Sequence, residues 1–376
     1  MAIKPVKHFT SLMSGAPTLT GAAGSLIAVL DACLVNGFNQ VTLDSLVVSG
    51  NVITGTKTGH GFSVDQVVVT AGANESQLNG EWTVTSVTSS TWSAVATGVA
   101  DVTGSGVITC KVAPAGWTKV FSGTNKAAYR GASGGTGCLL RVDDTGTLNA
   151  RVVGYETMTD VDTGSGLFPT SAQMSGGGYW PKGQDTTTAR RWFVAADTLL
   201  FYFQRNHFSS YHSLDAFGDY PSEKPGDAYN CLLQVCTSNS YVSSYVYTQI
   251  GYYGFMASSS SNMYGPRSYT QSGTSVQLAT AYLGMNGTRS GSGTGAFVYP
   301  SQANNGLILS PMAMSELSGP IKCMSIPGVY ATPQSAPLVN FDKISDVPTL
   351  VGRKLIALDT GNNDGRVFID LTGPWR

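Results

Sequence analysis

Apolar residues near the start of the chain recur at helical spacing, and residues 20–37 read as the one clear helix. Thr20 or Ser25 is placed to cap its first turn, and Gly37 is placed to end it. The apolar positions that share one face are Leu26, Ile27, Leu30, Cys33 and Leu34. The pattern predicts a short amphipathic helix that packs on a core.

From residue 46 to residue 112 the period changes to short alternating strands. Gly50-Asn51 lies between two such runs and predicts a tight turn, and Asn79-Gly80 is a second hairpin signal. Five or six short strands in this length are too few for a large sandwich. We expect a small barrel, because closing the sheet removes its exposed edges.

The segments on either side of this region look like two sides of one loop: Gly37-Phe38 before it and residues 114–117 after it. Loop tips tolerate insertions when the ends are close and exposed. We therefore predict a small β-barrel, residues 46–112, inserted into a β-rich host domain. That host would comprise residues 1–45 plus 113–376, with a possible second subdomain from about residue 190.

Later segments carry further strand and loop signals. The run at 190–204 is the most apolar and aromatic, and predicts two central strands around a turn at Ala196-Asp197. Residues 256–295 are rich in Ser, Gly, Thr and Asn and predict long surface loops. The chain closes on two expected strands joined by a turn at 361–365. The fold class predicted is mainly β, a multi-domain sandwich and barrel architecture with one short N-terminal helix.

Composition narrows the classes of partner. Charged residues make up 12% of the 376, half the roughly 25% that is usual in soluble domains. The net charge is −1 and no run of five Lys and Arg occurs, so we expect no nucleic-acid partner. A surface of hydroxyls and glycines suits faces later covered by other subunits, because few charges need desolvating.

The six cysteines lie far apart, and no CxxC pair offers a zinc ligand set. Their apolar flanks favour buried free thiols, and hence assembly in a reducing cytoplasm. The N-terminus has no apolar core of the kind that a signal peptide needs. The longest apolar stretch, SLIAVLDACLV, is too short to span a bilayer, so we expect no membrane insertion.

Two resemblances bear on function. GHGFSVDQVVVTAGANESQLNGEWTVTSVTSSTW resembles the small β-barrel module first described in the ubiquitin-activating enzyme, which recurs in phage tail proteins. The residues that carry the likeness are His60, Phe62, Val67 to Val69, Gly72, Asn79, Gly80, Trp82 and Val84. Val64-Asp65 replaces the usual Gly-Asp. In phages the module is a spacer or decoration, so the resemblance implies no chemistry.

Outside the barrel, six ordered motifs resemble a family of uncharacterised virion proteins of tailed phages and prophages. They are AGSLIAVLDACLVNGF, AGWTKVFSGTNKAAYR, LRVDDTG, ARVVGYETMTDVDTGSGLFPT, GRKLIALDT and VFIDLTGPWR. The resemblance implies a structural tail or baseplate protein in several symmetric copies. Its partners would be other phage structural proteins, and it would reside in the virion after assembly in the bacterial cytoplasm.

Candidate chemistry is sparse, and we predict no enzyme, no cofactor and no metal site. His207 and His212 are five apart near Asp215 and Asp219, a spacing that fits neither a zinc-protease helix nor one face of a strand. We expect a loop there, whose aromatic side chains pack over a sheet edge. Two acidic pairs could bind calcium, but turn chemistry explains them more simply. They are Asp143 with Asp144 and Asp160 with Asp162.

Tyrosines in the Gly- and Ser-rich segments are the one feature typical of recognition, since Tyr and Ser make adaptable contact surfaces. The candidate set is Tyr252, Tyr253, Tyr264, Tyr269 and Tyr282. Ordinary strand aromatics in a core are the competing interpretation. Three alternatives to a structural tail protein remain: a module that binds a host-surface glycan, a capsid decoration protein and, ranked last, a polysaccharide-degrading enzyme.

Overall fold

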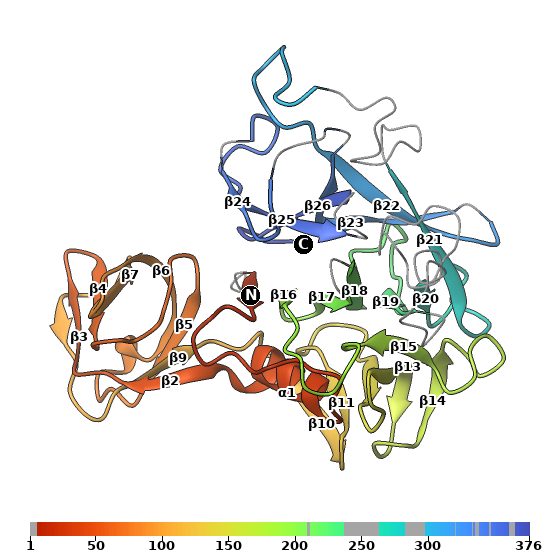
Figure 1. Ribbon diagram of the computed structural model, residues 1–376, viewed down its shortest axis with the longest axis horizontal. Coiled ribbons are helices and arrows are strands. Elements are labelled where there is room, and N and C mark those ends of the chain that lie inside the picture. Colours follow the sequence, from red (N-terminus) through yellow and green to blue (C-terminus); the bar gives the residue numbers. More distant parts are fainter. Residues whose placement is uncertain are drawn as a thin grey trace.

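The computed structural model describes most of the chain, namely residues 6–208, 211–236, 263–282, 298–319, 321–332, 334, 338–345, 347–360 and 365–376. These residues form three antiparallel sheets, one short helical segment near the N-terminus and a single 3-10 turn, η2 (Ser76–Leu78) (Figure 1). The predicted fold class, mainly β with a short N-terminal helix, is confirmed.

The helical segment is shorter than predicted. It consists of α1 (Ser25–Leu30) and a π-helical turn, Asp31–Asn36, that continues it to Gly37. Gly37 ends it with φ 71°, as expected. Neither Thr20 nor Ser25 caps the start, because the N-cap is Gly24 and makes no side-chain bond. The free amides of the first turn are bound instead by Asp144, far along the chain.

Residues 38–112 form an eight-stranded sheet with the order β2-β9-β5-β6-β7-β4-β3-β8. Its strands are β2 (Phe38–Thr42), β3 (Ser45–Ser49), β4 (Val52–Thr56), β5 (Val67–Ala71), β6 (Gly80–Val87), β7 (Thr91–Val95), β8 (Val102–Thr103) and β9 (Thr109–Val112). Because the end strands β2 and β8 do not pair with each other, the sheet is a half-barrel and not the closed barrel expected. It starts earlier than predicted, at residue 38.

The two predicted hairpins of the half-barrel differ in outcome. Gly50 and Asn51 both have positive φ and join β3 to β4 in a two-residue turn, as predicted. Asn79-Gly80 is not a tight turn, because the loop between β5 and β6 spans residues 72–79. The Asn79 amide instead bridges that loop, accepting from the Ala73 N–H at 2.9 Å and donating to the Ala73 carbonyl at 2.8 Å.

The entry and exit of the half-barrel lie side by side, as expected for an insertion. The Ala115 N–H donates to the Cys33 carbonyl at 2.9 Å, and the Trp117 N–H donates to the Leu34 carbonyl at 3.0 Å. A Cβ at Gly37 would lie 2.3 Å from the Val112 carbonyl oxygen, so only glycine permits this approach.

A six-stranded sheet follows, with the order β10-β11-β12-β13-β14 and β15 paired to β13. The strands are β10 (Thr118–Gly123), β11 (Lys126–Arg130), β12 (Leu139–Asp143), β13 (Asn149–Met158), β14 (Gly164–Phe168) and β15 (Gly178–Pro181). Tyr129 of this sheet donates to Asp31 at 2.8 Å, and Lys119 pairs with the same carboxylate at 2.6 Å. Asp31 thereby ties the helical segment to β10 and β11.

A twelve-stranded sheet completes the described part of the chain, in the order β1-β16-β17-β18-β19-β20-β21-β22-β23-β26-β25-β24. Its strands are β1 (Lys7–Thr10), β16 (Trp192–Ala196), β17 (Leu200–Phe208), β18 (Tyr211–Asp219), β19 (Cys231–Gln234), β20 (Met263–Gly265), β21 (Val276–Tyr282), β22 (Ser310–Glu316), β23 (Lys322–Ala331), β24 (Lys343–Ile344), β25 (Leu355–Thr360) and β26 (Gly365–Asp370).

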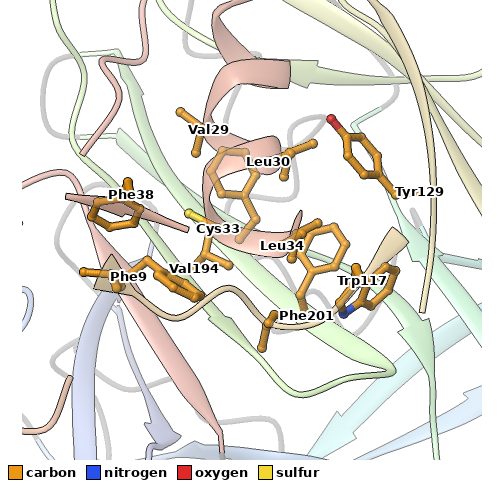
Figure 2. Close-up of a cluster of buried hydrophobic side chains, with 14 of the residues drawn as sticks. Phe9, Val29, Leu30, Cys33, Leu34, Phe38, Trp117, Tyr129, Val194 and Phe201 are labelled. Atoms are coloured by element: carbon orange, nitrogen blue, oxygen red, sulfur yellow. The ribbon is translucent and has the colours of Figure 1, made fainter. Parts of the chain in front are cut away.

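The centre of this sheet is buried on both faces, which explains the continuous apolar run at 190–204. In β17, Phe201 and Phe203 face one core, while Leu200 and Tyr202 face another, because successive side chains of a strand alternate. The turn between β16 and β17 falls at Asp197, as predicted. Figure 2 shows the first core, where Phe201, Val194 and Trp117 lie against the side chains of the helical segment.

Two other sequence expectations are settled by this sheet. The closing strands β25 and β26 pair antiparallel as predicted, and the residues of their turn, 361–364, lie outside the described residues. The expectation of long loops over 256–295 is wrong in part, because β20 and β21 fall within it as paired strands. Residues 266–275 form the turn between these two strands, while 256–262 and 283–295 lie outside the described residues.

Candidate functional site

Three connections meet at one end of the twelve-stranded sheet. They are residues 220–230 between β18 and β19, the turn 266–275 between β20 and β21, and, between β22 and β23, residues 317–319 and 321. Antiparallel pairing along β18 to β23 brings them together. Two adjoining hollows lie among them, one charged and one neutral.

The turn 266–275 is held against the six-stranded sheet by two contacts. The Arg267 guanidinium donates to both carboxylate oxygens of Glu156 in β13, at 2.8 and 2.7 Å. Such a bidentate pair fixes orientation as well as distance. The Gln173 side-chain amide also donates to the Ser275 carbonyl at 2.9 Å. The turn is therefore braced at both ends, which preorganises the hollows beside it.

The charged hollow has a volume of about 160 Å³. Lys322 pairs with Glu223 at 2.8 Å on its wall, and Lys224 lies 5.9 Å from the centre of the Tyr269 ring while its ammonium donates to the Tyr269 carbonyl. The buried Tyr220 also lines it, and burial raises the pKa of that phenol well above its ordinary value. A neutral phenol beside paired charges can donate and accept hydrogen bonds.

The neutral groove is larger, about 500 Å³, and none of the described residues that line it is charged. Its polar lining includes Gln173, Ser268, Ser272, Thr274, Gln277 and Ser318. Val276 and Leu317 add two apolar side chains, of which Leu317 is 49% exposed. Ser275 forms part of the wall, is 8% exposed, and its hydroxyl oxygen is enclosed without a hydrogen-bond partner.

The predicted tyrosines separate in the structure. Tyr269 is 45% exposed at the charged hollow, so this residue does lie on a surface. Tyr264 is 2% exposed and belongs to the core, so its assignment to a surface recognition set is wrong. Tyr282 ends β21, but its side chain lies outside the described residues, as do Tyr252 and Tyr253 entirely.

The histidine segment is not a loop as predicted but the hairpin of β17 and β18. His212 is buried and lies 3.2 Å from the Asn206 side-chain nitrogen, while Asp215 forms a buried ion pair with Arg205. The Asp219 carboxylate accepts from the Thr136 N–H and hydroxyl, both at 2.6 Å. Each acid therefore has its own structural partner.

The acidic pairs considered for calcium also serve local structure. Asp143 accepts from Thr145, and Asp160 accepts from the Asp162 N–H at 2.8 Å, both in turns. Asp162 faces the cations Lys126 and Arg141. Over the described ranges, no group of three His, Cys, Asp or Glu side chains converges as metal ligands would.

The six cysteines are all buried and free, as their apolar flanks predicted. No helix within the described residues is long and apolar enough to cross a membrane. Comparison of the chain with protein-family models and with curated proteins finds no match.

The groove escaped the sequence analysis because its lining comes from three separate segments: residues around 173, 268–277 and 317–318. A high density of Ser, Thr and Gln at 268–277 was the only local signal. That density favoured a surface loop and did not indicate which distant segments would complete a groove.

Proposed function

We propose that the chain is a structural component of a tailed-phage virion, associated with the tail or baseplate and assembled in several symmetric copies. The single observation that carries this proposal is the ordered set of motifs resembling tailed-phage virion proteins. In the fold, residues from separate motifs contact one another: Asp144 binds the amide of Leu26, and Tyr129 binds Asp31. Contacts between distant motifs are expected if proteins with these motifs share one fold, because such contacts hold its parts together.

The C-terminal motif supports the same proposal. Arg376 donates to both carboxylate oxygens of Asp197 at the turn between β16 and β17, at 3.0 and 3.1 Å. Trp375 packs on Tyr202, with ring centres 5.0 Å apart. The residues of the resembling motifs thus stabilise the fold. A protein in which the family motifs stabilise the fold and form no catalytic site is typical of a structural component of an assembly.

Surface chemistry and thiol burial also favour this role. Buried thiols survive both the reducing cytoplasm, where the protein would be made, and later exposure outside the cell. Exposed valines on the half-barrel include the cross-strand pair Val52 and Val95, which are 41% and 61% exposed. Apolar cross-strand pairs of this kind are suited to contacts with a neighbouring subunit.

Antibody labelling of intact virions in negative stain tests the proposal. We expect label on the tail or baseplate, with the chain also present in the mass spectrum of purified virions. Virions that carry no label and no peptides of this chain would overturn the proposal. Label confined to the capsid would replace the tail assignment with a capsid decoration role.

A second candidate function, a module that binds a host-surface glycan, is favoured by the two adjoining hollows at one end of the sheet. Tyr269 is placed on the surface there, as a recognition residue would be. Purified protein should then adsorb to host cells and compete with phage adsorption. Unchanged adsorption at saturating protein would exclude this function.

A further inference from the structure

We propose that the neutral groove beside the turn 266–275 binds an uncharged carbohydrate chain. This inference rests on the second candidate function and names its ligand class and binding residues. The groove volume of about 500 Å³ falls within the ~300–1,000 Å³ typical of ligand sites. Tyr264 and Tyr269, the predicted tyrosines whose side chains are described, do not line it, so the groove assigns binding to a different set of side chains.

The polar lining matches a ligand with many hydroxyl groups. Thr274 and Ser318 are exposed, and their hydroxyls make no hydrogen bond to other described residues. The Ser275 hydroxyl has no partner among the described residues either, and this residue is buried, with 8% of its surface exposed. A buried hydroxyl without a partner is costly, and a serine hydroxyl can rotate among three staggered positions. A ligand oxygen in the groove would supply the missing partner.

Other hydroxyls of the turn are already engaged and shape the groove. The Thr270 hydroxyl lies 2.6 Å from that of Ser268 and 2.7 Å from that of Ser272. The Gln277 side chain donates to the Tyr264 hydroxyl at 3.3 Å. These bonds hold the lining in place, so that binding needs little ordering of side chains.

Charge argues for an uncharged ligand. Among the described lining residues there is no cation, and the nearby Arg267 is already paired with Glu156. A carboxylate or phosphate entering the groove would lose hydration without gaining an oppositely charged partner from the described lining, which is unfavourable. The groove therefore disfavours uronic-acid chains, nucleic acids and phosphorylated ligands.

A peptide ligand fits less well than a sugar. Peptide recognition relies on pockets for apolar side chains or on pairing with a free strand edge. Here the described lining offers only two apolar side chains, Val276 and Leu317, and the adjoining strand β21 is paired on both sides. Two apolar side chains among hydroxyls suit the C–H face of a pyranose ring.

The test uses the full chain on an array of immobilised oligosaccharides, with neutral hexose and N-acetylhexosamine chains beside uronic-acid chains of equal length. Three variants accompany the wild type: Ser275→Ala, the double variant Thr274→Val with Ser318→Ala, and the control Ser213→Ala. Ser213 in β18 also has an enclosed hydroxyl without a partner, but it does not line the groove. Thermal unfolding of each variant reports on folding.

We expect the wild type to bind neutral chains and to leave uronic-acid chains unbound. Ser275→Ala and the double variant should each weaken binding at least tenfold with unchanged thermal midpoints, while Ser213→Ala binds as the wild type does. The inference is overturned if no neutral chain binds, if the groove variants bind normally, or if only acidic chains bind. Virion labelling is independent of this array, so failure of the virion assignment and failure of the groove can be told apart.

Discussion

Replacing Asp144 by alanine should destabilise the protein by about 3–5 kcal/mol, the usual effect of removing one partner of a buried ion pair. Asp144 and Lys182 are both fully buried and form an ion pair. The other carboxylate oxygen accepts the amides of Leu26 and Ile27 at 2.8 and 3.2 Å, at the first turn of α1. The substitution would leave a buried ammonium and two helix amides without this acceptor.

The magnitude follows from what remains at the site. Lys182 would keep the carbonyls of Ala22 and Gly146 at 2.7 and 3.0 Å, which are weaker partners than a carboxylate. Burial raises the pKa of Asp144 and lowers that of Lys182, so each group loses hydration in the fold. Loss of a helix cap alone typically costs ~0.5–2 kcal/mol. The cost of losing the helix cap is included in the ~3–5 kcal/mol expected for Asp144→Ala, because the cap and the ion pair belong to one hydrogen-bond network.

A double-mutant cycle separates the ion pair from the cap. Asp144→Asn keeps an acceptor for the helix amides, and Lys182→Met removes the ammonium while keeping an unbranched side chain. The double variant contains no buried charge, so we expect it to be more stable than Asp144→Asn alone. Urea unfolding followed by tryptophan fluorescence gives each free energy of unfolding. A loss below about 1 kcal/mol for Asp144→Ala, or strictly additive single variants, would refute the reasoning.

Two further predictions concern the half-barrel and acid stability. Replacing residues 39–112 by a short Gly-Ser linker should give a folded protein, with a thermal midpoint lowered by less than about ten degrees. The lost Asp65–Lys343 and Asp65–Lys354 pairs are partly exposed and individually weak, and Lys7, which loses Glu81, keeps its bond to the Pro114 carbonyl. An insoluble product would mean that half-barrel and body form one cooperative unit. Burial lowers the pKa of His8 from 6.5 to about 3, so the unfolded chain takes up a proton that the fold does not. Stability should fall by about 1.4 kcal/mol per pH unit below pH ~6.5, and an unchanged slope in His8→Gln would contradict this.

Local patterns predicted the elements whose causes are local. Gly50-Asn51 gave the correct hairpin because both residues readily adopt positive φ. The apolar run around Asp197 gave two central strands because burial on both faces needs continuous hydrophobicity. In each case the residues that decide the structure lie within a few positions of the element.

Elements decided by distant residues were missed. The start of α1 depends on a carboxylate 118 positions later, and sequence patterns near Thr20 and Ser25 could not reveal it. Asn79 has the composition of a turn residue, yet its amide closes a longer loop on Ala73. The Ser- and Gly-rich turn 266–275 concealed β20 and β21, which are short strands stabilised by their neighbours in the sheet. The groove could not be predicted either, because its lining comes from three segments that only the fold brings together.

The pairing of β1 with β16 has a consequence for how the chain folds during its synthesis. Ser11, next to β1, accepts from the Trp192 N–H, 181 positions further along the chain. At ~5–20 residues per second, a ribosome needs roughly 10–40 s to make that interval. The strands between residues 38 and 112 pair with one another and can assemble within it. We therefore expect the half-barrel to form first on the ribosome. The apolar face of α1 can be buried only later, when the strands around Val194 and Phe201 have been synthesised.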